Sequence, residues 1–174
     1  MAYDNCETPV APVVPVTPGA PGAPGTLGGK AEFLVADLLE PESVVELFER
    51  LGSRAEKLDI LINNAGIFGG NALESVQLED IQRVLTVNVT SLIIATREFV
   101  RRTKSRNGKI INISSAAARF PGLNASVYAA SKAAVDALAR SWAIELGPRG
   151  ITVNSVSPGL IDTEMSAQHM PDDR

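Results

Sequence analysis

The stretch Ile110-Ile-Asn-Ile-Ser-Ser115 is an aliphatic run that ends in two serines, and it predicts a β-strand. Residues 126–146 follow with the apolar spacing of a helix, which Gly147-Pro148 ends. A further aliphatic run, from Ile151 to Val156, predicts the next strand. Because these strands are apolar along their whole length rather than at alternate positions, we expect them to lie parallel and buried on both faces of a sheet.

The residues before this unit repeat the alternation of strand and helix. Residues 32–36 and 59–62 predict two strands, and residues 78–106 predict a long helix. Pro41 opens a further helix over residues 41–51. The sequence therefore predicts an α/β fold, and in such sheets ligands bind beyond the carboxyl ends of the strands.

The first residues of the chain have a different character. Proline recurs at every third position between Pro9 and Pro24, and glycine keeps the same period. Because proline fixes φ and has no backbone N–H, we expect residues 1–27 to be a disordered or extended tail, with a proline-rich docking ligand as the alternative. Residues 28–166 form the expected domain, and residues 167–174 a flexible C-terminus.

Composition excludes several classes of protein. The chain has 174 residues, of which 45% are hydrophobic and 21% charged, as in an ordinary globular domain. A net charge of −4 argues against a nucleic-acid interface, and no apolar run approaches the roughly 18 residues of a membrane span. Cys6 and His169, each the sole residue of its type, leave no internal disulfide and no metal site of the usual zinc spacing. With no signal-peptide pattern, a cytoplasmic location is expected.

Two side chains near the start of helix 126–146 suggest chemistry. Tyr128 and Lys132 are four residues apart and share one helix face, where an ammonium next to a phenol suits general acid–base catalysis. An ordinary exposed pair has the same spacing. Ser115 lies thirteen residues upstream at a strand end, and Asn88 is an asparagine in the middle of an apolar helix, which is unfavourable unless its amide has a role. These four residues are the candidate catalytic set.

The order and spacing of the motifs resemble the classical short-chain dehydrogenase/reductase family, in its 3-oxoacyl-carrier-protein reductase-like branch. The resemblance covers about residues 28–166. It implies a Rossmann-type, doubly wound parallel sheet with flanking helices, and hydride transfer between NAD or NADP and an alcohol or ketone. The motifs that carry it are Asp37, Asn63-Asn64-Ala65-Gly66, Asn88, Ser115, Tyr128-Ala-Ala-Ser-Lys132 and Pro158-Gly159-Leu-Ile-Asp-Thr163.

The resemblance also implies roles for these residues. Tyr128 would be the general acid/base, and Lys132 would assist it and hold the nicotinamide ribose. Ser115 would bind the substrate carbonyl, and Asn88 would help hold a water of the proton relay. The residues implied to contact the cofactor are Asp37, Asn63, Ala65, Gly66, Tyr128, Lys132, Pro158, Gly159, Ile161 and Thr163.

One family motif is absent from the sequence. No Gly-x-x-x-Gly-x-Gly loop, which would hold the pyrophosphate at a helix N-terminus, precedes residue 28. We therefore expect a partial sheet that lacks the family's first two strands and its last, with strands 32–36 and 59–62 left as unpaired edges, and weak dinucleotide binding by this chain. The alternative function is an inactive remnant or an assembly subunit. Family members commonly form homo-oligomers, so helices 78–106 and 126–146 are the expected contact surface.

Overall fold

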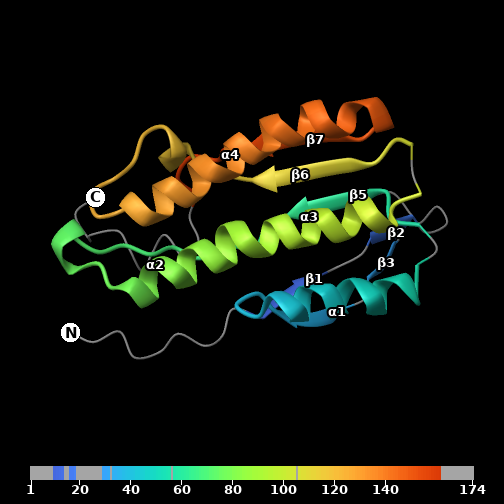
Figure 1. The fold of residues 1–174 in the computed structure, drawn as a ribbon, viewed down its shortest axis with the longest axis horizontal. Helices are drawn as coiled ribbons and strands as arrows, with labels where there is room; N and C mark the ends of the chain where they lie inside the picture. The colour runs from blue at the N-terminus through green and yellow to red at the C-terminus, as the bar shows by residue number, and fades with distance from the viewer. Residues whose placement is uncertain are drawn as a thin grey trace.

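The computed structural model places the helices of the chain on one side of its strands (Figure 1). It describes residues 10–13, 16–18, 29–31, 33–55, 57–104 and 106–161. The strands are β1 (Val10–Val13), β2 (Val16–Pro18), β3 (Gly29–Ala31), β4 (Leu34–Asp37), β5 (Ile60–Asn63), β6 (Lys109–Ile113) and β7 (Thr152–Val156). The α-helices are α1 (Pro41–Gly52), α2 (Leu78–Leu85), α3 (Ser91–Arg102) and α4 (Ser126–Leu146). Short helical turns are η1 (Leu73–Ser75), η2 (Thr86–Thr90), η3 (Ala116–Ala118) and η4 (Gly147–Arg149).

Strands β5, β6 and β7 form a parallel sheet in that order. Ile60 pairs with Lys109 at one end of the sheet, and Ile113 pairs with Val156 at the other. Each strand is joined to the next by a helical crossover, as the alternation of aliphatic runs and helical patterns predicts. The α/β prediction is therefore confirmed, and α4 has the predicted bounds of 126–146.

The long helix predicted over residues 78–106 differs from the prediction in two ways. Its middle, Thr86–Thr90, is a π turn between α2 and α3, in which the backbone carries one extra residue per turn. Its end is at Arg102 rather than residue 106, because Thr103 has extended dihedral angles and its hydroxyl donates to the carbonyl oxygen of Leu58 at 2.7 Å. The helix is thus stopped by a bond to another segment.

The N-terminal strands correct two further predictions. Residues 10–13 and 16–18, within the segment expected to be a tail, form β1 and β2, while the rest of residues 1–27 lies outside the described residues. Strand β4 pairs antiparallel with β1, so the expectation of an unpaired edge at 32–36 is wrong. Proline is tolerated in edge strands, and both β1 and β2 belong to two-stranded ribbons, which consist of edges only. Strand β5 is an edge of the β5–β6–β7 sheet among the described residues, as expected.

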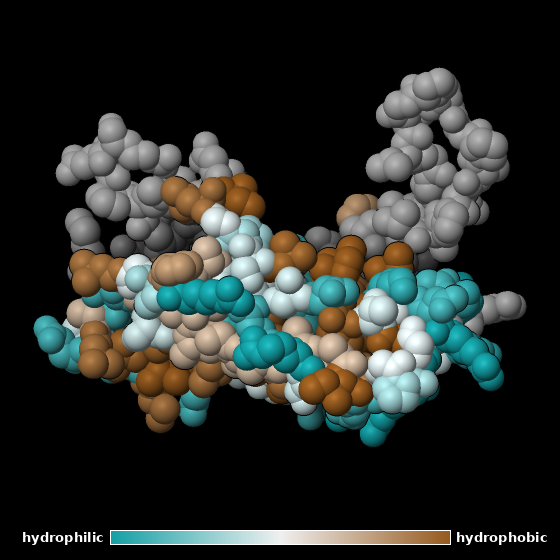
Figure 2. All heavy atoms as spheres, turned by 90° about the horizontal axis from the view of Figure 1, so that it is seen from above, coloured by the Kyte–Doolittle hydropathy of each residue, from teal (hydrophilic) through white to brown (hydrophobic). Residues whose placement is uncertain are grey.

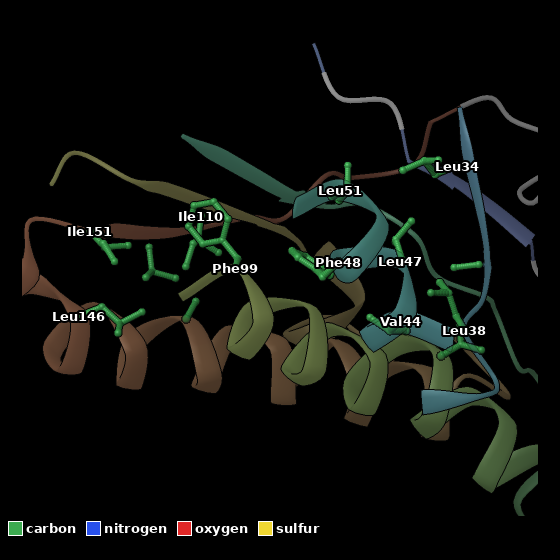
Figure 3. Close-up of a cluster of buried hydrophobic side chains, with 14 residues drawn as sticks. Leu34, Leu38, Val44, Leu47, Phe48, Leu51, Phe99, Ile110, Leu146 and Ile151 are labelled. Carbon is green, nitrogen blue, oxygen red and sulfur yellow. The ribbon is translucent and has the colours of Figure 1, made fainter. Parts of the chain in front are cut away.

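Aliphatic side chains fill the space between the helices and the strands (Figure 3). Helix α1 contributes Val44, Leu47, Phe48 and Leu51, whose i, i+3, i+4, i+7 spacing forms one buried face. Strand β6 contributes Ile110, which is fully buried. The same cluster includes Leu34, Ala36, Leu38, Val87, Phe99, Ala139, Leu146, Ile151 and Val153. This core packs the amino-terminal parts of β6 and β7 against the second half of α4, and the site lies at the opposite, carboxyl ends of these strands.

The opposite face of the sheet carries aliphatic side chains that remain exposed. Leu61 packs on the core, so its neighbours Ile60 and Ile62 point away from the helices, with exposed fractions of 60% and 58%. Val156 at the end of β7 is 47% exposed. Hydrophobic side chains, drawn brown, are visible on the molecular surface in Figure 2. None of the helices in the described part of the chain is long and apolar enough to cross a membrane.

Candidate functional site

The carboxyl ends of the parallel strands bring the predicted site residues to one edge of the sheet. Asn63 ends β5, Ser114 follows β6, and Pro158 lies two residues beyond β7. Two backbone bonds tie these ends together: Ser114 N donates to Val156 O at 2.7 Å, and Ala116 N donates to Pro158 O at 2.8 Å. Helix α4 packs against η3 at this edge. Its N-terminal turns therefore present their side chains to the strand ends.

Lys132 is the charged centre of the site. Its side chain is buried, at 5% exposure, and its Nζ donates to the carbonyl oxygen of Ile113 at 2.9 Å. Burial lowers the pKa of this ammonium from its usual 10.5, because desolvation disfavours the charged form, while the negative charge of Asp136 acts in the opposite direction. Asp136 lies one turn along α4 and accepts a hydrogen bond from the Ser155 hydroxyl of β7.

Tyr128 is half-buried next to this ammonium. Lys132 Nζ lies 5.8 Å from the centroid of the Tyr128 ring, within the range of a cation–π contact. The ring of Phe68 lies 5.0 Å from the Tyr128 ring, centroid to centroid, with the two planes tilted by 49°. Phe68 therefore helps to fix the phenol, a role that the sequence patterns did not indicate.

Asn88 is buried in the π turn, and its amide is held by hydrogen bonds to two other segments. Its Oδ1 accepts from Ile67 N at 2.8 Å, and its Nδ2 donates to Ile67 O at 2.9 Å and to Ser131 Oγ at 3.0 Å. Gly66 lies beside both this amide and Lys132, since a methyl group built on Gly66 would lie 3.2 Å from both Asn88 Oδ1 and Lys132 Nζ. The absence of a side chain at Gly66 thus leaves room next to both polar groups.

The two serines after β6 use their hydroxyl groups differently. Ser114 is buried, and its hydroxyl donates to the backbone oxygen of Lys132 at 3.0 Å. Ser115 Oγ instead accepts from Ala117 N at 3.1 Å as the N-cap of η3, which leaves its own hydrogen available to a ligand. The geometry of the hydroxyl groups therefore favours Ser115 over Ser114 as a donor to substrate.

The remaining residues expected to contact a cofactor lie at or beyond the ends of β5 and β7 in this sheet, except that Asp37 ends β4 of the separate β1–β4 pair. The Asp37 carboxylate accepts from Leu39 N at 2.9 Å and so closes the turn into α1. Asn63 Nδ2 donates to Thr96 Oγ1 at 3.1 Å and to Asn112 Oδ1 at 2.8 Å, which ties β5 to α3 and β6. Ala65, Gly159 and Ile161 are exposed, and Pro158 is half-buried. Thr163 lies outside the described residues.

Together these groups form a site suited to moving a proton next to a bound carbonyl or alcohol. A buried ammonium lies near a phenol, and a serine with a free hydroxyl hydrogen lies at the neighbouring strand end. Sequence reasoning missed Ser131 and Asp136. The sequence did indicate a contact for Asp136, because it follows Lys132 by four residues on the same predicted helix. Ser131 is a serine inside a helix, and nothing in the sequence distinguishes it.

Comparison with known proteins agrees with this arrangement. Residues 21–174 match the family model described as short chain dehydrogenase. The chain is 42% identical over 146 residues to the uncharacterized oxidoreductase YgfF of Escherichia coli, and 37% identical over 141 residues to the 3-oxoacyl-[acyl-carrier-protein] reductase FabG of Aquifex aeolicus. Both alignments cover 80% of this chain. A short chain dehydrogenase from Burkholderia cenocepacia, solved in complex with NADP, is 43% identical with a TM-score of 0.71 over 75% of this chain.

The chain is shorter than these proteins. It spans 59% of the length of YgfF, 57% of that of FabG and 53% of the Burkholderia chain. The segment matched by the family model, residues 21–174, includes the strand ends and α4, where the candidate residues lie.

Proposed function

Because the chain belongs to the short chain dehydrogenase family, in its FabG-like branch, we propose that it is an NAD(P)-dependent oxidoreductase. The reaction is hydride transfer between the nicotinamide and the carbinol or carbonyl carbon of a small alcohol or ketone. The observation that carries the proposal is the buried Lys132 ammonium, held by Ile113 O and placed 5.8 Å from the Tyr128 ring.

The residues present fit a nicotinamide cofactor at this edge. Gly66 offers bare backbone beside Asn88 and Lys132, where a side chain would fill the space that a ribose edge needs. Lys132 is a cation with hydrogens beyond the one given to Ile113 O, so it suits the ribose hydroxyl groups. Pro158, Gly159 and Ile161 suit the nicotinamide, while Asp37, Asn63 and Ala65 suit the adenosine end, and Thr163 belongs to the same proposal.

The bound cofactor supplies the carbon that gives or accepts the hydride. Ser115 donates its hydroxyl hydrogen to the substrate oxygen, and Tyr128 gives its phenolic proton to that oxygen or takes it back. Lys132 stabilises the negative charge that develops on the phenol oxygen as the proton leaves, more strongly in this buried setting than it would in water. Asn88 is proposed to hold a water that passes the proton onward.

The alternative of an inactive remnant has less support. Burying the Lys132 ammonium costs free energy of folding that a neutral residue would avoid. In an inactive protein this cost would have no catalytic benefit to offset it. Keeping Lys132 with its partners Ile113 O and Asp136 is consistent with use of the charge.

The test follows the absorbance of reduced nicotinamide with NAD or NADP and a panel of alcohols and ketones. Because dinucleotide binding is expected to be weak, we expect slow turnover in the wild type and in Tyr3→Phe, the matched control at the other tyrosine, and a further loss of about 100-fold or more in Tyr128→Phe. Turnover that survives Tyr128→Phe would overturn the assignment. Absence of both turnover and calorimetric cofactor binding would favour the remnant.

A homo-oligomer through α2–α3 and α4 is part of the proposal. Ala130, Ala133 and Ala137 lie on the exposed side of α4, where small side chains allow a second helix to approach closely, and Ile144 on the same helix is 82% exposed. Light scattering of the purified chain tests it, and a monomer at high concentration would contradict it.

A further inference from the structure

Ser131 is fully buried, with 0% exposure, and its hydroxyl joins two elements of the fold. Ser131 Oγ donates to the backbone oxygen of Tyr128 at 2.6 Å, one turn back along α4. It also accepts from Asn88 Nδ2 at 3.0 Å, across the gap between α4 and the π turn. A single hydroxyl group therefore connects the helix of the catalytic pair with the segment that carries Asn88.

The directions of these hydrogen bonds are fixed by the available donors. A hydroxyl has one hydrogen, and Tyr128 O can only accept, so Ser131 must be the acceptor in its bond with Asn88. The Nδ2 group of Asn88 then has both hydrogens satisfied, one by Ser131 and one by Ile67 O. The amide has a single orientation that satisfies all three of its contacts, with Oδ1 toward Ile67 N and toward the space beside Gly66.

This orientation matters at Lys132. Asn88 Oδ1 and Lys132 Nζ lie beside the same face of Gly66, each 3.2 Å from the point where a methyl group on that glycine would be. Lys132 directly follows Ser131, so movement of Ser131 away from Asn88 also moves the first turns of α4 relative to the π turn. The separation of Asn88 Oδ1 and Lys132 Nζ beside Gly66 therefore depends on the Ser131–Asn88 contact.

We propose that Ser131 is a positioning residue, which clamps Asn88 to α4 and so holds the Asn88 amide and the Lys132 ammonium in place beside Gly66. The inference rests on the proposed function for its consequence in catalysis. Packing alone does not account for the contact. Among the described residues, the buried Ser91 hydroxyl bonds to the backbone oxygen of Val87 in its own helical stretch, whereas Ser131 adds to such a bond a second one to another element.

The experiment compares Ser131→Ala with Ser91→Ala in the purified chain. Nitrogen-15 NMR measures solvent exchange of the Asn88 side-chain amide, identified as the signal pair that is absent from Asn88→Asp. In the same proteins, mass spectrometry measures the rate at which an amine-acylating reagent labels Lys132 relative to Lys104, which is exposed.

We expect Ser131→Ala to speed Asn88 amide exchange by roughly tenfold, the factor that one ordinary hydrogen bond is worth, and to raise the relative labelling of Lys132. Ser91→Ala is expected to leave both unchanged. A folded Ser131→Ala protein in which Lys132 labelling stays at the wild-type value would overturn the proposal, even if amide exchange rises, because the hydroxyl would then serve packing alone.

If Ser131→Ala does not fold by circular dichroism, Ser131→Cys is measured instead. It keeps the shape of the side chain with a weaker acceptor, so smaller changes in the same direction are expected, and their absence would overturn the proposal. Neither measurement requires cofactor or turnover. Loss of the proposed oxidoreductase activity with an intact clamp would therefore refute the function alone.

Discussion

The Lys132 ammonium donates to the carbonyl oxygen of Ile113 across 2.9 Å, and this bond joins the second turn of α4 to the last residue of β6. Ile113 ends the strand, so its carbonyl group is free to accept from a side chain. The bond fixes the amine at the edge of the sheet without a carboxylate partner in direct contact. The pKa of Lys132 is therefore set by its burial and by the nearby charge of Asp136.

Replacing Lys132 by methionine is expected to change how stability depends on pH. In the folded protein the pKa of Lys132 lies below its usual 10.5, because burial disfavours the charged form. Between that lowered pKa and 10.5 the unfolded chain binds more protons than the folded one, so the unfolding free energy rises with pH. Lys132→Met removes this rise. Urea unfolding from about pH 7 to 10.5 measures both slopes, and identical slopes would show that Lys132 titrates alike in the two states.

Asp136→Asn is expected to lower the pKa of Lys132 further. The Asp136 charge favours the protonated amine, and the amide does not. The pH midpoint of Lys132 labelling should therefore fall. Ser155→Ala is the matched control, since it removes the hydrogen bond to Asp136 but leaves the charge, and it should cost about 1–3 kcal/mol of stability with little change in the midpoint. A midpoint that moves equally in both variants would contradict the electrostatic role.

Gly66→Ala is expected to disturb the site while leaving the fold intact. The new methyl group would approach Asn88 Oδ1 and Lys132 Nζ to 3.2 Å, so both must shift, at a cost of roughly 1 kcal/mol. Turnover should fall by a larger factor than the small loss of folding stability alone would cause. Gly52→Ala at the end of α1 serves as the control, because no atom lies within 4 Å of its added methyl group. Thermal unfolding and nicotinamide absorbance together check the pair, and full activity in Gly66→Ala would count against a close approach of ligand there.

Glu98→Gln is expected to destabilise the protein by about 1–3 kcal/mol. Glu98 is 2% exposed, and its carboxylate accepts from Arg97, Arg101 and Arg102 of its own helix. The amide cannot satisfy all three guanidinium groups. Arg97→Ala should cost less than about 1 kcal/mol, because Arg97 is 46% exposed and two cations remain. Urea unfolding of the two variants measures the difference, and equal costs would mean that the carboxylate is not the centre of the cluster.

The fold was predictable where local patterns agree with tertiary packing. Helix α4 begins and ends where its apolar spacing and Gly147-Pro148 indicate, and β5, β6 and β7 lie within one residue of the expected runs. The π turn at Thr86–Thr90 was not predictable, because Asn88 is stabilised there by Ile67, whose position depends on the fold. Strand β1 escaped prediction because the period-three prolines between Pro9 and Pro24 indicate an extended chain, whereas the pairing of β1 with β4 is a contact between distant segments.

The site was predictable to a similar degree. The four-residue spacing indicated Tyr128 and Lys132, and an unusual position inside an apolar helix indicated Asn88. The structure brings all three to one edge of the sheet. The predicted role of each remains a prediction. Ser131 and Phe68 gave no signal, since serine and phenylalanine are ordinary in a helix and a loop, and only the folded arrangement shows that they contact Asn88 and Tyr128.

The π turn also sets the angular phase between α2 and α3. In an α-helix each residue advances the side-chain direction by about 100°. The wider π turn accommodates one additional residue, so the side chains of α3 keep the direction that they would have without that residue. Deleting a single residue other than Asn88 from Thr86–Thr90 would restore a plain helix and leave Leu92, Thr96 and Phe99 facing the core. Such a deletion would remove the widened backbone that places the Asn88 amide against Ile67, so the extra residue of this turn serves the site rather than the packing of the helix.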